Sequence, residues 1–234
     1  MTQLTNLVRS LTATGVAVVC SAQLTAASLD DIQFWAGTGA NRAALVIDWQ
    51  DAQAPQSLLW GFRWDGTATG LDMLQAVVNA DPRLYAHLGQ FGWGTAVFGL
   101  GYDLNDNGVF AVDPPVAFDS GGLAVDTNPD DARTAVDAGD HWREGWNTGF
   151  WAYYLKGSSG DAWEWAMTGA ADRVLSNGAW DGYSFAAGFV SAAPGEPVPA
   201  AVPEPGTLAL LVFGALALAR QWTAPTRHGA PRAS

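Results

Sequence analysis

Apolar and polar positions alternate most clearly between residues 57 and 64. Leu58, Trp60, Phe62 and Trp64 share one side of an extended chain, whereas the other side carries smaller or charged residues. A period of two residues predicts a strand with one buried face. The apolar run at 43–49 predicts a second strand. We expect the two strands to form a hairpin, because the segment 50–56 between them is polar and contains proline.

A helix is predicted after this hairpin. Thr69 is placed to cap it, with Asp72 at the spacing of a capping box. Apolar positions 71, 74 and 78 then fall on one helical face. The helix should end at Asp81, because a residue that precedes proline is pushed out of the helical region.

The remaining periodic segments predict mostly short strands, at 84–91, 95–102, 109–112, 150–155, 162–167 and 183–190. Glycines at 157 and 160 indicate a turn, and 130–138 has the pattern of a second, short helix. This order favours an α+β domain of mainly antiparallel strands with one or two helices. A β-sandwich with an added helix is the alternative.

The N-terminus, residues 1–27, has the pattern of a secretory signal peptide. Arg9 provides a positive charge, an apolar stretch follows, and Thr25-Ala26-Ala27 offers small residues for cleavage before Ser28. The only cysteine, Cys20, lies inside this leader. The exported domain, expected at 28–193, would therefore contain neither a disulfide nor a thiol nucleophile.

The C-terminus divides into three segments. Residues 194–206 are rich in proline and predict an extended linker outside the core. Residues 207–219 are apolar and uncharged, and predict a transmembrane helix about 20 Å long. The tail at 220–234 begins with Arg220 and carries no acidic residue, so we expect it on the cytoplasmic side.

Taken together, these terminal features resemble the PEP-CTERM sorting signal. The resemblance rests on Pro203-Glu204-Pro205 with Gly206, the apolar segment after it, and Arg220. It implies that an exosortase, a membrane enzyme, reads the motif and passes the protein to the surface of a bacterium that makes exopolysaccharide. The tail after Arg220 is longer than the family usually shows.

Charge narrows the range of partners. Between Ser28 and Ala200 there are 22 acidic and 7 basic side chains. A field of this sign repels phosphate backbones and therefore disfavours nucleic acid, whereas it favours cations such as calcium.

The sequence Asp103-Leu-Asn105-Asp-Asn107-Gly108 is typical of the first half of a calcium loop. Hard oxygen ligands recur every second residue, and the glycine permits a sharp turn. Position twelve is Pro114, so the usual glutamate is missing, and Asp113 is the candidate substitute. Asp, Asn and Gly also build ordinary turns, which is the competing interpretation.

No catalytic constellation is evident. His141 and Glu144 would share a face only on a helix, and nucleophile-elbow, P-loop and zinc-protease motifs are missing. Pairs of carboxylates of the kind used by glycosidases occur by chance in so acidic a domain. We therefore expect a domain that is not an enzyme, with an envelope polysaccharide hydrolase as the alternative.

The chain contains 12 tryptophans. Most are expected in the core, because each buries a large area that a domain without disulfides needs. Trp163, Trp165 and Trp180 are the candidates for stacking on a sugar or another ligand. The leading hypothesis is thus a non-enzymatic surface or matrix protein with a binding or structural domain, whose exposed tryptophans would bind polysaccharide or a small ligand.

A second resemblance concerns the segments 150–157 and 177–183. Their aromatic strand and glycine turn look like the final hairpin of transcobalamin-like C-terminal domains, and residues 67–74 resemble the short helix of that family. The resemblance implies binding of a small ligand of the cobalamin type.

Overall fold

The computed structural model describes residues 26–203, which form a β-rich domain with one helix. Its large sheet has the strand order β1-β3-β2-β12-β10-β11, with β13 alongside β3. The bounds of these strands are β1 (Trp35–Gly37), β2 (Asn41–Asp48), β3 (Ser57–Trp64), β10 (Gly149–Lys156), β11 (Glu164–Trp165), β12 (Trp180–Ala187) and β13 (Val198–Pro199).

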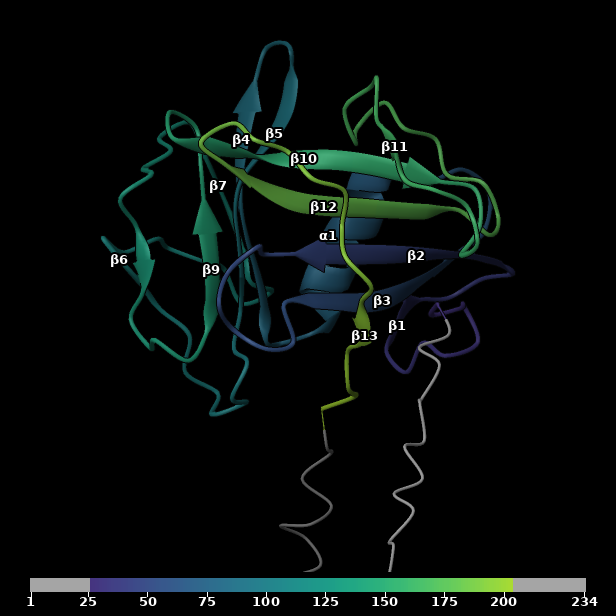
Figure 1. Ribbon diagram of the computed structural model, residues 1–234, viewed down its shortest axis with the longest axis horizontal. Helices are drawn as coiled ribbons and strands as arrows, with labels where there is room; N and C mark the ends of the chain where they lie inside the picture. The colour runs from purple at the N-terminus through teal and green to yellow at the C-terminus, as the bar shows by residue number, and fades with distance from the viewer. Residues whose placement is uncertain (1–25, 204–234) are drawn as a thin grey trace, which may run out of the picture.

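A second sheet has the order β7-β4-β5-β9, and two short strands pair beside it. These elements are β4 (Leu84–Phe91), β5 (Gly94–Tyr102), β6 (Val112–Asp113), β7 (Leu123–Asp126), β8 (Thr134–Ala135) and β9 (His141–Glu144). Figure 1 shows the strands of this sheet running across the direction of the large sheet, with α1 (Gly70–Ala80) behind the latter.

The predicted hairpin and helix are both present. β2 and β3 pair antiparallel. Leu58, Trp60, Phe62 and Trp64 all enter one buried cluster, as their alternation predicts. Thr69 and Asp72 form the capping box of α1, and the buried face of the helix packs into the same cluster.

One core joins the two sheets and the helix. The cluster that holds the β3 side chains also includes residues of α1, β4, β5, β10 and β12. Trp49, which is fully buried, connects the sheets: its indole N–H donates to the Leu100 carbonyl at 2.9 Å. A smaller cluster around Ile32 and Trp180 covers the other face of the large sheet. Residues 26–203 therefore contain a hydrophobic core of their own, which a domain needs to fold independently.

The segment 194–206, predicted to be an extended linker outside the core, is partly built into the large sheet. Val198 and Pro199 form β13, and the Ala200 N–H donates to the Leu59 carbonyl at 2.9 Å. Ala200 is buried in the main cluster. Proline is tolerated here because β13 lies on the edge of the sheet. The ordered domain thus continues past residue 193.

The first and last described residues lie at the same edge of the domain (Figure 1). Close to this edge the Ala27 backbone N–H donates to the carboxylate of Glu196. The β4–β5 hairpin and the loops around β11 project from the opposite edge in this view.

Other expectations need correction. Residues 130–138 contain turns and the short strand β8 but no helix, because the carboxylates of Asp130 and Asp137 accept backbone N–H groups two residues on. The strand predicted at 109–112 is reduced to β6, that at 162–167 to β11, and that at 183–190 begins at Trp180 instead. The pairs β1–β3, β4–β7, β2–β12 and β3–β13 are parallel, so the sheets are mixed.

Both expected membrane-directed segments lie almost entirely outside the described residues. The leader at 1–27 enters the described part only at residue 26, and the segment 207–219 lies wholly outside it. Among residues 26–203, no helix has the length and apolar character needed to cross a membrane.

Candidate functional site

The Asp103 loop follows β5 and closes on itself. The two carboxylate oxygens of buried Asp103 accept the backbone N–H groups of Asn107 at 3.2 Å and Gly108 at 2.8 Å. Gly108 has φ +74°, which favours glycine. The Asn105 side-chain oxygen also accepts the Asn107 N–H, at 3.1 Å. The loop is thus curled around the Asp103 carboxylate, while Asn105, Asp106 and Asn107 are exposed.

Two aspartates from a later turn lie next to the Asp103 loop, and together with Asp103, Asn105 and Asn107 they form one cluster of oxygen-bearing side chains. Asp137 Oδ2 accepts the amide groups of Asn105 at 2.9 Å and Asn107 at 3.2 Å. Asp140 Oδ1 accepts the Leu104 N–H at 3.1 Å. Asp137 and Asp140 come from the turn between β8 and β9, whose position next to the loop is set by the pairing of β5 with β9.

Asp140 is the least satisfied member of the cluster. Asp140 is only 4% exposed, and its Oδ2 has no hydrogen-bond partner among the described residues. Burial raises the pKa of Asp140 to about 6, and the nearby Asp103 carboxylate contributes to the increase. By contrast, the Gly139 N–H and the Asn105 amide lower the pKa of half-buried Asp137. A buried carboxylate beside another negative charge is unfavourable unless a cation or a proton compensates it.

The oxygen set fits a hard cation such as calcium, which accepts carboxylate, amide, backbone and water oxygens. No group of three or more Asp, Glu, His or Cys side chains in residues 26–203 is arranged to hold a metal. A cation here would therefore need amide and water oxygens besides the carboxylates of Asp103 and Asp140. Asn105 could supply one by rotating its amide, which exchanges N and O.

Asp113, the expected twelfth-position substitute, is not part of this cluster. It lies exposed on β6, and its side chain makes no hydrogen bond or ion pair in the described structure. Sequence reasoning missed Asp137 and Asp140, although the Asp-Ala-Gly-Asp sequence there has the composition of a ligand turn.

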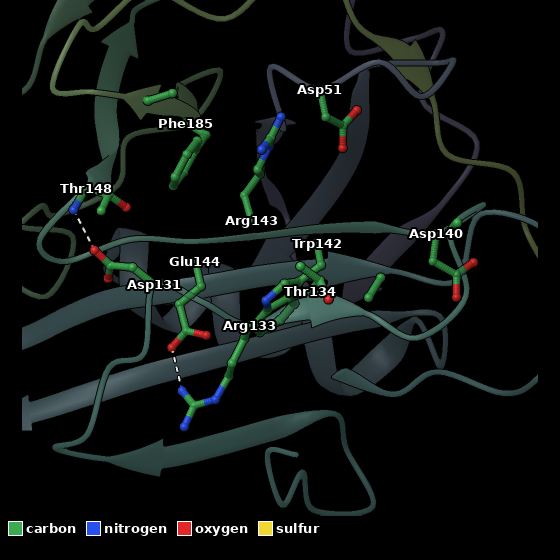
Figure 2. Close-up of a pocket in the computed structure, with 13 residues that line it drawn as sticks. Asp51, Asp131, Arg133, Thr134, Asp140, Trp142, Arg143, Glu144, Thr148 and Phe185 are labelled. Carbon is green, nitrogen blue, oxygen red and sulfur yellow. Dashed lines mark hydrogen bonds and ion pairs between the residues drawn. The ribbon is translucent and has the colours of Figure 1, made fainter. Parts of the chain in front are cut away.

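A cleft of about 500 Å³ lies beside the cluster and shares Asp140 with it. Figure 2 shows its lining, in which Arg143, Phe185 and Asp51 stand opposite Glu144 and Arg133. The cleft lies between the end of β12, β9 and the turns before and after β9. Its lining is mainly polar and carries charges of both signs.

The carboxylates of this cleft are held by fixed donors. Glu144 Oε1 accepts Arg133 at 2.7 Å and the Asp130 N–H at 3.1 Å, and it lies 3.0 Å from His87 Nδ1. Asp131 accepts three successive backbone N–H groups, at residues 146–148. Glu144 Oε2, by contrast, is buried without a hydrogen-bond partner in the described structure.

Neither buried histidine has a nitrogen left for a substrate. His87 lies between Glu144 and Asp126, each at 3.0 Å. Burial alone would lower its pKa, but the bonds to both carboxylates outweigh this and raise it. His141 contacts Asp51 and the Pro55 carbonyl and stacks on Trp49. Because β9 is a strand, His141 and Glu144 point to opposite faces rather than sharing one.

The three stacking candidates have different environments. Trp180 is 1% exposed and belongs to the core, so the prediction that it stacks on a ligand is wrong. Trp163 is half-buried, with the Lys156 ammonium 4.5 Å from its ring centre. Trp165 is 47% exposed and is the only one of the three with a large free surface.

Comparison with known proteins identifies the C-terminal signal. Residues 201–221 match the PEP-CTERM protein-sorting motif. The chain therefore carries an exosortase-processed signal, which implies export and a membrane-anchored C-terminus before release at the surface. Pro203 is the last described residue of this motif, whereas Glu204, Pro205, Gly206 and Arg220 lie outside the described residues. No curated protein and no solved structure matches the chain.

Proposed function

We propose that this exported domain is a non-enzymatic binding or structural module that is stabilised by one calcium ion at the Asp103 loop. The observation that carries the proposal is the buried Asp140 carboxylate, whose Oδ2 has no partner among residues 26–203 and which lies close to Asp103. A cation between these carboxylates would compensate both charges and link the end of β5 to the turn before β9.

An extracellular location suits such a site. Calcium modules outside the cell have dissociation constants of about 10⁻⁴–10⁻³ M, and a two-carboxylate site with amide and water ligands belongs at this weak end. The non-enzymatic part of the proposal is supported by the cleft, where fixed donors hold Glu144 and Asp131.

Thermal unfolding of the 26–203 domain in chelator and in calcium tests the proposal. An ion that binds only the native state stabilises it by RT ln(1 + [Ca²⁺]/Kd), which is about 1.4–2.7 kcal/mol at 10 mM calcium and these dissociation constants. We expect a rise in Tm with millimolar calcium that Asp103→Ala abolishes. Asp113→Ala is the matched control and should keep the full rise. If the wild-type domain shows no shift, or if the control loses it, the loop is an ordinary turn.

A further inference from the structure

A second, smaller groove lies away from the charged cleft. It has a volume of about 260 Å³ and is bordered by the start of β5, the residues after β9, the first half of β10 and the loop at 168–170. Four aromatic residues of adjacent strands line it, namely Phe150, Trp151 and Tyr153 on β10 and Tyr183 on β12. Trp146 adds a fifth ring near the opening and is 42% exposed.

The groove carries no charge. None of its lining residues is acidic or basic, although the domain has 22 acidic side chains. The lining residues are Thr95, Ala96, Val97, Gly145, Trp146, Phe150, Trp151, Tyr153, Thr168, Gly169, Ala170 and Tyr183. An ionic ligand would find no counter-charge here, so the lining suits a neutral molecule.

The groove offers hydroxyl groups beside its aromatic rings. Thr168 is exposed at its border, and Thr95 is half-buried, with its hydroxyl donating to Gln90 Oε1 at 3.0 Å. Tyr183 is 2% exposed, and its phenolic oxygen is buried without a hydrogen-bond partner in the described structure, so a ligand does not reach it. Its ring stacks on Tyr153 with centroids 4.9 Å apart. Because the threonine hydroxyls can pair with those of a ligand, the occupant should carry hydroxyl groups as well as apolar faces.

The orientation of Trp146 is fixed from outside the groove. Phe91 stacks on it with centroids 5.6 Å apart, and Phe98 meets it edge to face at 5.2 Å. Trp93 stacks on Phe91 in turn, at 4.8 Å. These contacts position the indole before any ligand arrives, which reduces the entropy lost on binding.

We propose that this groove binds one or two sugar units of a neutral polysaccharide. Pyranose rings combine apolar faces, which pack on the exposed part of Trp146, with hydroxyls that pair with Thr95 and Thr168. The volume lies just below the range of about 300–1,000 Å³ found for drug-sized ligands, so it fits a short stretch of a chain. The proposal specifies the ligand of the binding module proposed above and does not depend on the calcium site.

Titration of the 26–203 domain with neutral hexasaccharides of glucose, galactose and mannose, and with an oligouronate of equal length, tests the proposal. Isothermal calorimetry should detect binding of at least one neutral probe and none of the oligouronate. Trp146→Ala should weaken this binding at least tenfold. Thr95→Val should weaken it about fivefold while leaving Tm unchanged, a combination that a purely structural role would not give.

Trp165→Ala is the control, because Trp165 is exposed but does not line the groove. It should bind like the wild type. The proposal is overturned if no neutral probe binds, if the oligouronate binds more tightly, or if binding survives both groove variants. Repeating the titration in chelator separates the two proposals, since failure of the calcium site would appear only as a missing rise in Tm.

Discussion

Replacing Asp140 by asparagine should have opposite effects with and without calcium. The variant keeps Oδ1, which accepts the Leu104 N–H, and exchanges the unpartnered Oδ2 for an amide group. It thus removes one buried negative charge next to Asp103 with little change in shape. In chelator the variant should be more stable than the wild type, whereas calcium should stabilise the wild type alone.

The magnitude follows from the pKa of Asp140, which burial raises from 3.8 to about 6. Each pKa unit of this difference corresponds to about 1.4 kcal/mol, so the ionised Asp140 carboxylate destabilises the folded domain by roughly 3 kcal/mol at pH 7. For a domain of this length, that corresponds to a rise in Tm of about 6–12 °C in the variant. The folded state also binds the proton more tightly than the unfolded state, so the calcium-free wild type should gain stability as pH falls from about 7 to 4.

The assay is chemical unfolding at pH 7 and pH 5, followed by tryptophan fluorescence, in EDTA and in 10 mM CaCl₂. If Asp140→Asn is less stable than the wild type in EDTA, the carboxylate is already well accommodated and needs no cation. If calcium stabilises both proteins equally, the ion binds elsewhere. Either result would refute the electrostatic argument for the site.

Three further predictions concern other parts of the chain. Glu144→Gln should destabilise the domain by about 3 kcal/mol at pH 6, because it breaks a buried network. The effect should shrink as pH rises, because the pKa of His87 is raised in the folded domain. The ion pair of charged His87 with Glu144 therefore stabilises the fold fully below about pH 6.5 and is lost as pH rises through the folded-state pKa. Urea titrations at pH 6 and at alkaline pH check this. Ending the chain at Ala193 instead of Pro203 should lower the unfolding free energy by about 1–3 kcal/mol through loss of the β13 hydrogen bonds, measured by the same method. Glu204→Ala should leave the exported protein in the membrane fraction of the producing bacterium, which cell fractionation and immunoblotting detect.

Local signals in the sequence predicted the local structure. The alternation in β3 and the Thr69 capping box depend on residues within a few positions of one another, and both are present as expected. The parallel pairs were missed for the opposite reason. β12 lies next to β2, far from it in sequence, and β13 next to β3. No local pattern encodes such contacts.

In the candidate site, too, local features could be predicted, whereas contacts between segments distant in sequence could not. The Asp103 loop could be predicted because its oxygens recur within one short segment. Asp137 and Asp140 could not, because only the pairing of β9 with β5 brings them to the loop. The helix predicted at 130–138 is absent, because the Asp130 and Asp137 carboxylates accept backbone N–H groups two residues on and favour turns.

The position of β13 determines how a tethered domain would present its groove. β13 fixes the last described residues to the edge of the large sheet beside β3, and residues 201–221 carry the sorting motif directly after it. A membrane anchor would therefore hold the domain by this edge. The β4–β5 hairpin, which supplies Thr95 to the groove, projects from the opposite edge in Figure 1. A ligand that approaches from that side would reach the groove without meeting the anchored edge.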